Sequence, residues 1–289
     1  MKAYPARLPA ESFFLTAAQG KRFCIYHAPP TDRACRGAFI YVHPFAEEMN
    51  RSRRVVALQA RQFAEKGYGV LIIDLFGCGD STGEFAEATW EIWNADLAIA
   101  EKWLHQRLQT RISLWGLRLG ALLAMDFARC AQNQITSIIL WQPVISGKSF
   151  MTQFLRLRAA RDMLSDEQKS GRISTTTNAM RSAMLAGETL EIAGYDISPA
   201  LGSAIDALDA NTLWVNTAPI HWFDITGSSL NTMPPSTLAV VNEWRRQNAD
   251  LRLHTVSDQP FWATQDISEA PTLLSLTTSV LDDFSVMST

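Results

Sequence analysis

A glycine-framed turn at residues 116–120 holds the part of this chain whose residue types and spacing best fit a chemical site. An apolar run from Arg111 to Trp115 leads into Gly-Leu-Arg-Leu-Gly, and an apolar helical run from Ala121 follows directly. Where such a turn reads Gly-x-Ser-x-Gly, its central serine is a nucleophile raised on a strained strand-to-helix turn. Here the central residue is Arg118, and a guanidinium stays protonated and cannot attack a carbonyl. The turn therefore predicts an architecture for acyl chemistry in which the nucleophile has been replaced.

A cation at this position needs a negative partner. Arg118 lies where a helix begins, and the free N–H groups and the helix dipole already favour anions there. A cation at such a place is unfavourable by about 0.3–1 kcal/mol unless it is paired. The partner is either a carboxylate of the chain, for which the sequence offers Glu47, Glu48, Asp224 and Asp258, or an anionic group of a ligand.

Apolar runs typical of buried strands alternate with helical segments along most of the chain. The expected strands of the main sheet are 38–42, 70–75, 111–115, 134–141, 218–225 and 251–256. The expected helices are one that Ser52 caps, one with its apolar stripe from Trp90 to Leu104, and those at 121–128, 200–208, 236–248 and 271–284. Residues 12–15 and 22–26 are expected to add an antiparallel hairpin. This alternation predicts an α/β fold with a mostly parallel central sheet flanked by helices.

Residues 146–199 interrupt the alternation with charged and polar residues. We expect short helices without a buried strand in this stretch. The sequence therefore predicts a core formed by residues 1–145 and 200–289, with a small helical cap at 146–199 over the carboxyl edge of the sheet. Extra helices packed on the side of the sheet are the alternative.

A glycine-rich loop at residues 77–83 follows the second expected strand of the alternation. A dinucleotide-binding Gly-x-Gly-x-x-Gly loop would need glycine at Thr82, and it would follow the first strand. The loop instead fits the pattern Asp-x-x-Gly-x-Gly-x-Ser-x-Gly, which starts at Asp74 and includes Cys78 and Ser81. No cofactor is expected.

These motifs resemble those of the α/β-hydrolases, in which a loop of this pattern precedes the nucleophile turn and a cap follows the next strand. Within that superfamily the sequence motifs resemble those of the exosortase A system-associated hydrolase 2 proteins, which are encoded beside exosortase and exopolysaccharide genes. The residues that carry this resemblance are 43–50 (His-Pro-Phe-Ala-Glu-Glu-Met-Asn), 115–120 (Trp-Gly-Leu-Arg-Leu-Gly) and 260–262 (Pro-Phe-Trp). The resemblance implies an α/β-hydrolase fold and a cytoplasmic setting beside those systems.

The resemblance also implies where a Ser-acid-His triad would lie. The serine position holds Arg118. The acid would lie near Ser228 or, after the preceding strand, at Gln142, and the histidine would lie at 258–260, where the sequence has none. His254 falls inside a strand. We therefore expect a non-classical or inactive serine hydrolase.

Two functions from different classes follow. In the first, a small-molecule acyl or anionic ligand is bound by Arg118, Leu119, and the oxyanion-loop residues His43 and Phe45. In the second, the chain is an active ester, thioester or amide hydrolase with rearranged groups, for which Ser81, Cys78 and His43 are the fallback candidates. Pure partner binding, with a closed pocket beside Arg118, is a third possibility.

Composition limits the remaining function classes. The net charge is −3 in 289 residues, which gives no bulk electrostatic case for nucleic acid or anionic membrane. The four cysteines show no metal-ligand spacing, so no metal is expected. No apolar run approaches the roughly 20 residues that a membrane-spanning helix needs, and no apolar signal core follows Met1. A soluble cytoplasmic protein is expected, with its oligomeric state open.

Overall fold

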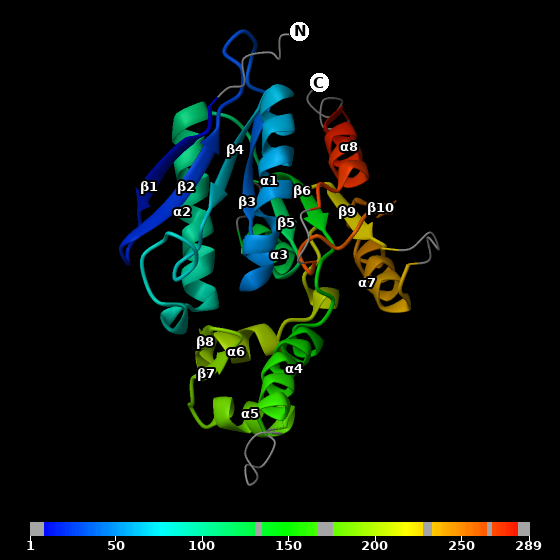
Figure 1. Ribbon diagram of the computed structural model, residues 1–289. Coiled ribbons are helices and arrows are strands. Elements are labelled where there is room, and N and C mark those ends of the chain that lie inside the picture. Colours follow the sequence, from blue (N-terminus) through cyan, green and yellow to red (C-terminus); the bar gives the residue numbers. More distant parts are fainter. Residues whose placement is uncertain (1–8, 131–134, 167–175, 228–232, 265–267, 283–289) are drawn as a thin grey trace, which may run out of the picture.

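A single eight-stranded sheet forms the centre of the molecule (Figure 1). The computed structural model describes residues 9–130, 135–166, 176–227, 233–264 and 268–282. The strands lie in the order β1-β2-β4-β3-β5-β6-β9-β10. Their bounds are β1 Glu11–Thr16, β2 Lys21–His27, β3 Gly37–Val42, β4 Tyr68–Ile73, β5 Ile112–Leu117, β6 Ile135–Trp141, β9 Ile220–Ile225 and β10 Leu251–Val256.

All strand pairs of this sheet from β4 to β10 are parallel. Strands β1 and β2 form the predicted antiparallel hairpin, and β2 pairs antiparallel with β4. The inner strands β3, β4 and β5 are buried along their whole length, as expected for parallel strands covered on both faces. The predicted α/β fold with a mostly parallel sheet is confirmed.

Helices cover both faces of the sheet. Helices α1 (Glu47–Glu65) and α8 (Pro271–Ser279) pack over one face, where Phe63 and Leu273 join Trp115 and Trp141 in one core cluster. Helices α2 (Trp90–Leu108), α3 (Leu119–Cys130) and α7 (Pro235–Arg246) supply the cluster on the other face. Short 3₁₀ turns lie at Phe85–Glu87 (η1) and Ala210–Thr212 (η2).

The predicted start of the first helix was wrong. Ser52 lies inside α1, which begins at Glu47, and its hydroxyl donates to the carbonyl of Met49 at 3.0 Å. The residue before the helix is Ala46, with φ 51° and no side-chain cap. Helix α8 ends at Ser279, and the last two positions predicted for it, 283–284, lie outside the described residues.

Between β6 and β9 the chain forms a separate lobe at the carboxyl end of the strands (Figure 1). The lobe contains α4 (Gly147–Asp166), α5 (Thr177–Leu185), β7 (Leu190–Ile192), β8 (Tyr195–Ile197) and α6 (Pro199–Asp206). Helix α6, which the sequence analysis assigned to the core, packs against α4 and α5. The division of the chain into core and cap stays a prediction.

The expectation of a cap without buried strands was wrong at one hairpin. Strands β7 and β8 pair antiparallel, with Leu190, Ile192 and Ile197 buried. Ala193 and Gly194 connect them with φ values of 53° and 86°, as a two-residue turn with two left-handed residues requires. The alternation of apolar and polar residues here was the missed signal.

Candidate functional site

The turn between β5 and α3 has the geometry of a nucleophile elbow. Arg118 has φ 56°, a left-handed conformation that costs a residue with a Cβ about 1–2 kcal/mol. Its N–H donates to Trp141 O at 3.0 Å, and its carbonyl accepts from Ala121 N at 3.1 Å. A Cβ on Gly116 would lie 2.5 Å from Ala121 Cα. A Cβ on Gly120 would clash with the backbone carbonyl of His43, in the loop after β3. Glycine on both sides lets the helix approach the sheet, and Arg118 then lies at the tip of the turn.

The side chain of Arg118 is held between a carboxylate and an indole. Its Nε lies 3.3 Å from Glu48 Oε1, and its guanidinium carbon lies 5.4 Å from the ring centre of Trp262. The side chain is 18% exposed. A cation over an indole contributes about 0.5–2 kcal/mol, depending on how far it is desolvated. These two contacts offset the strain of the turn and the unfavourable cation at the helix start.

Of the four carboxylates considered as partners, Glu48 is the one that pairs with Arg118. Asp224 Oδ1 accepts from the Gln142 amide at 3.4 Å, and Asp258 Oδ2 accepts from Leu273 N at 2.7 Å, at the start of α8. Glu47 contacts residues of the cap and of its own helix. Glu48 follows the oxyanion-loop segment directly, so α1 carries it to the elbow.

The environment of Glu48 disfavours its charge. Burial raises the pKa of this carboxyl, although Arg118 acts against that shift. Glu48 Oε2 is buried and has no hydrogen-bond partner among the residues that the structure describes. One oxygen is therefore paired with the guanidinium, and the other is left without a hydrogen bond to a described residue.

The acid of a triad was expected at one of two places, Gln142 after β6 or near Ser228 after β9. Gln142, with φ 42°, closes the end of β6, and its amide bridges the Ile225 N–H and Asp224. Asp224 is buried within β9, and this burial raises its pKa. The other position, near Ser228, lies outside the described residues.

The loop after β10 brings Trp262, rather than a histidine, to Arg118. His254 lies within β10, where its Nε2 is 3.1 Å from Nδ1 of His221 and its ring stacks on Phe223 at 4.5 Å. The Arg118–Trp262 contact thus joins the elbow to the segment in which the family pattern places histidine.

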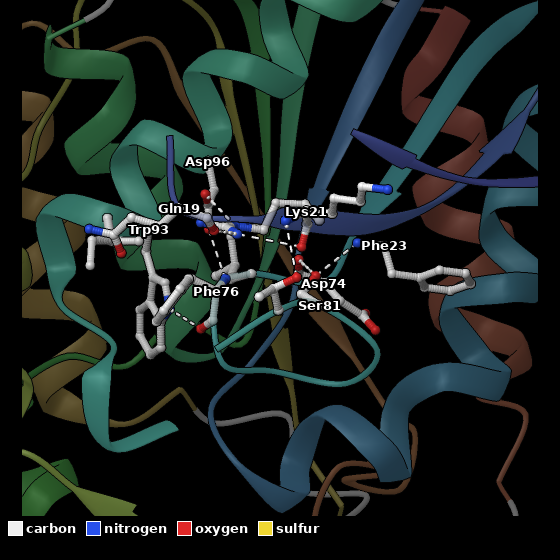
Figure 2. A network of polar contacts seen from close by, with 12 residues as sticks. Gln19, Lys21, Phe23, Asp74, Phe76, Ser81, Trp93 and Asp96 are labelled. Carbon is white, nitrogen blue, oxygen red and sulfur yellow. Dashed lines mark hydrogen bonds and ion pairs between the residues drawn. The ribbon is translucent and has the colours of Figure 1, made fainter. Parts of the chain in front are cut away.

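Ser81 is fixed inside the glycine-rich loop, as Figure 2 shows. Its hydroxyl donates to Asp74 O at 2.5 Å and accepts from Phe23 N at 2.8 Å. Beside it, Asp96 accepts from Arg22 Nε at 2.6 Å and from Phe76 N at 2.8 Å. These bonds attach the loop to β2 and α2, and they occupy the Ser81 hydroxyl.

Cys78 and His43 face the interior behind the elbow. Burial raises the pKa of the Cys78 thiol far above its ordinary value, so the thiol stays protonated. His43 Nδ1 lies 2.8 Å from Pro44 O, and its Nε2 lies 3.2 Å from Leu75 N. The first contact places the proton on Nδ1, and burial lowers the pKa of this imidazole. The neutral ring therefore connects the oxyanion loop to the glycine-rich loop.

A cavity of about 290 Å³ opens beside Arg118, between the core and the cap. Phe45, Phe150, Phe154, Leu157 and Trp262 form its apolar walls, and charged and polar groups come from Glu47, Glu48, Arg51, Arg118 and Gln153. Behind the oxyanion loop, at Leu119, only about 10 Å³ is free, because the aromatic residues there fill the space. The open space thus lies in front of the elbow, on the side of α4.

Sequence reasoning missed the cap residues of this cavity. Phe150 and Phe154 pack edge-on against Phe45, at 5.7 and 5.1 Å between ring centres. Their spacing with Leu157, at i, i+4 and i+7, is that of one helix face. That spacing was the signal that could have assigned them to a wall facing the core.

The described residues contain neither a candidate metal site nor a candidate membrane-spanning helix. No group of three or more His, Cys, Asp or Glu side chains there is arranged to hold a metal ion. None of the described helices combines the length and apolar character that a bilayer crossing requires.

The sheet order, the elbow and the excursion after β6 define the α/β-hydrolase class. The family described as serine aminopeptidase, S33 matches residues 33–202, more than half of the chain, and the chain belongs to this family. Protein ABHD12B of Homo sapiens is 30% identical over 130 residues, which are 44% of this chain and 34% of that protein. The chain therefore matches about a third of that relative's length.

Solved structures agree on the fold. Est1E from Butyrivibrio proteoclasticus with bound ferulic acid superposes with a TM-score of 0.65 at 15% identity, covering 95% of this chain and 98% of that one. A thermostable carboxyl esterase from Bacillus coagulans, in complex with glycerol, gives 0.64 at 13%, covering 95% and 98%. At these identities the likeness extends to the fold alone.

Proposed function

We propose that this chain is a non-classical member of its family that binds a small acyl or anionic ligand in the cavity beside Arg118. In this proposal it acts as a cytoplasmic accessory protein of an exosortase or exopolysaccharide system and is inactive as a serine hydrolase. The observation that carries the proposal is Arg118 at the tip of the elbow, paired with Glu48 and stacked on Trp262 at the edge of an apolar cavity.

The cavity suits a ligand with an apolar body and one charged end. Its aromatic walls would remove the body from water. Its volume of about 290 Å³ is near the lower end of the range of roughly 300–1,000 Å³ found for ligand pockets. A carboxylate at the elbow would meet the guanidinium of Arg118 and the N-terminus of α3, and both favour an anion.

Binding can be tested by calorimetric titration with octanoate and with its uncharged methyl ester. Octanoate should bind more tightly than the ester. Arg118→Gln should lower the affinity for octanoate at least about tenfold, the equivalent of about 1.4 kcal/mol of binding free energy. Arg54→Gln is the matched control: Arg54 lies on α1, the helix that carries Glu48, but it pairs with Glu269 and does not line the cavity. Equal affinity of octanoate for wild type and Arg118→Gln would exclude an anion site at the elbow.

The absence of serine hydrolase chemistry needs a separate test. The pure protein should resist labelling by a fluorophosphonate probe and should not turn over short p-nitrophenyl esters. Ester turnover that survives Arg118→Ala but is lost in Ser81→Ala or Cys78→Ala would overturn the proposal and assign catalysis to the glycine-rich loop.

The unpaired oxygen of Glu48 supports a second candidate, an active ester, thioester or amide hydrolase with rearranged groups. Here Glu48 Oε2 would take a proton from a water molecule as that water attacks the acyl carbon, and would then pass it to the leaving group. Arg118 and the Leu119 N–H would stabilise the oxyanion. Turnover of p-nitrophenyl esters that is lost in Glu48→Gln and retained in Ser81→Ala would establish this candidate.

A further inference from the structure

A second cavity lies at another part of α1, away from the elbow, and encloses about 250 Å³. Strands β2, β3 and β4 form its floor, and α1 forms its wall. The residues that line it are Ala10, Ile25, His27, Tyr41, His43, Met49, Ser52, Arg53, Val56, Ala57, Arg61, Ile72 and Asp74. Of these, none lines the cavity beside Arg118.

Two buried polar groups at this cavity have no hydrogen-bond partner among the described residues. They are the Tyr41 hydroxyl and Nε2 of His27, on side chains that are 2% and 4% exposed. Ser52 lines the same cavity, but its hydrogen is donated to Met49 O, and its hydroxyl makes no hydrogen bond with Tyr41. An unsatisfied buried polar group costs about 1–3 kcal/mol, so a bound group that pairs with both would be stabilised.

The charge around the cavity is positive. Asp74 is the carboxylate among the lining residues, and its Oδ2 already accepts from Arg53 at 3.0 Å and from Asp80 N at 3.2 Å. Arg61 at the rim has no ion pair with a described carboxylate. Burial is the main cause that lowers the pKa of His27, and the positive charge of Arg61 lowers it further. The charge of Arg61 is therefore felt inside the cavity.

We propose that this second cavity is a binding site for a short organic carboxylate. The carboxylate would lie toward Arg61 and accept hydrogen bonds from the Tyr41 hydroxyl and from the His27 imidazole. The apolar chain would lie against Val56, Ala57 and Ile72. At about 30 Å³ per water molecule in the liquid, 250 Å³ corresponds to roughly eight waters, which suits a six-carbon acid rather than a long acyl chain.

The site connects to the elbow through His43. This residue lines the cavity, and its imidazole joins the oxyanion loop to the glycine-rich loop. A ligand here would contact both His43 and Asp74, which hold those loops, without entering the cavity beside Arg118.

The test is a titration of the histidine-labelled 289-residue chain with hexanoate, followed in imidazole ¹H–¹⁵N spectra. The chain has five histidines, so His27→Gln identifies the reporter signal by its loss. The His27 signal should shift saturably, whereas that of the exposed His105 on α2 should stay in place. Tyr41→Phe, which keeps the ring, and Arg61→Gln should each lower the affinity for hexanoate, as measured from the His27 signal, at least about tenfold. Arg54→Gln should leave that affinity unchanged.

Three outcomes would overturn the proposal. The His27 signal could fail to move at concentrations that saturate the Arg118 cavity. Hexanol could move it as strongly as hexanoate does, which would show an apolar cavity without anion recognition. Tyr41→Phe and Arg61→Gln could both respond like wild type. Running the series in an Arg118→Gln background separates this site from the elbow, because the His27 response should survive there even if octanoate binding is lost.

Discussion

Replacing Arg118 with glutamine should destabilise the protein more than replacing its partner Glu48 with glutamine. The carboxyl of Glu48 is partly buried, and burial raises its pKa despite the nearby guanidinium. In Arg118→Gln a carboxylate stays at this place without its cation, which costs about 1–3 kcal/mol for a group left unsatisfied in a partly buried site. Glu48→Gln removes the disfavoured charge instead and keeps an oxygen that can accept from Arg118 Nε. The cation of Arg118, then without its carboxylate at the helix start, costs about 0.3–1 kcal/mol, so the free energy of unfolding should change by less than about 1 kcal/mol.

The sign of the pH dependence follows from the direction of the shift. A carboxyl whose pKa is raised in the folded state favours folding while it is protonated and loses that contribution as pH rises through the folded pKa. The destabilisation of Arg118→Gln should therefore be largest near pH 7.5. It should shrink as pH falls toward the ordinary range of a glutamate pKa, because protonated Glu48 no longer needs a cation.

These differences can be measured by urea unfolding at pH 7.5 and pH 4.5 of wild type, both single variants and the double variant. The comparison holds if the slope of the unfolding free energy against urea concentration is the same for all four. The double variant should recover part of the stability lost in Arg118→Gln, as expected for residues in contact. An Arg118→Gln variant as stable as wild type at pH 7.5, or one that loses more stability at pH 4.5, would refute the reasoning.

Three other substitutions test the scaffold of the site. Ser81→Ala should lower the free energy of unfolding by about 1–3 kcal/mol in urea, because it leaves a backbone N–H of β2 without its acceptor; an unchanged midpoint would contradict this role. Asp96→Ala should cost about 3–5 kcal/mol, since it leaves the fully buried guanidinium of Arg22 unpaired, and a loss below 1 kcal/mol would show that water reaches that pair. Gly120→Ala should give little folded protein by circular dichroism, because its Cβ would clash with the carbonyl of His43; a native spectrum would show that the elbow can shift.

The sheet could be predicted from the sequence because its strands are covered on both faces. Such strands need continuous apolar runs, and the run at 38–42 lies in β3, which is buried along its whole length. The start of α1 could not be predicted in this way. Ser52 has the residue type of a cap, but the helix begins earlier, at Glu47. The residue before it, Ala46, has a positive φ and makes no side-chain cap.

The candidate site was partly predictable. Arg118 and the elbow follow from local spacing, and the need for a carboxylate follows from its charge at a helix start. The choice of Glu48 does not, because the two residues are 70 positions apart in the sequence. The contact depends on how α1 leaves the loop after β3. The stacking of Trp262 likewise depends on where the loop after β10 folds.

The Arg118–Trp262 contact helps to explain how the elbow accommodates an arginine at its tip. In this structure the turn after β5 and the loop after β10 meet at the carboxyl edge of the sheet. At this edge the guanidinium carbon of Arg118 lies 5.4 Å from the ring centre of Trp262. The strain at Arg118 persists because Glu48, Trp262 and the flanking glycines together fix its conformation. The strained turn thus holds a guanidinium at the edge of the cavity, where our proposal has it bind an anion.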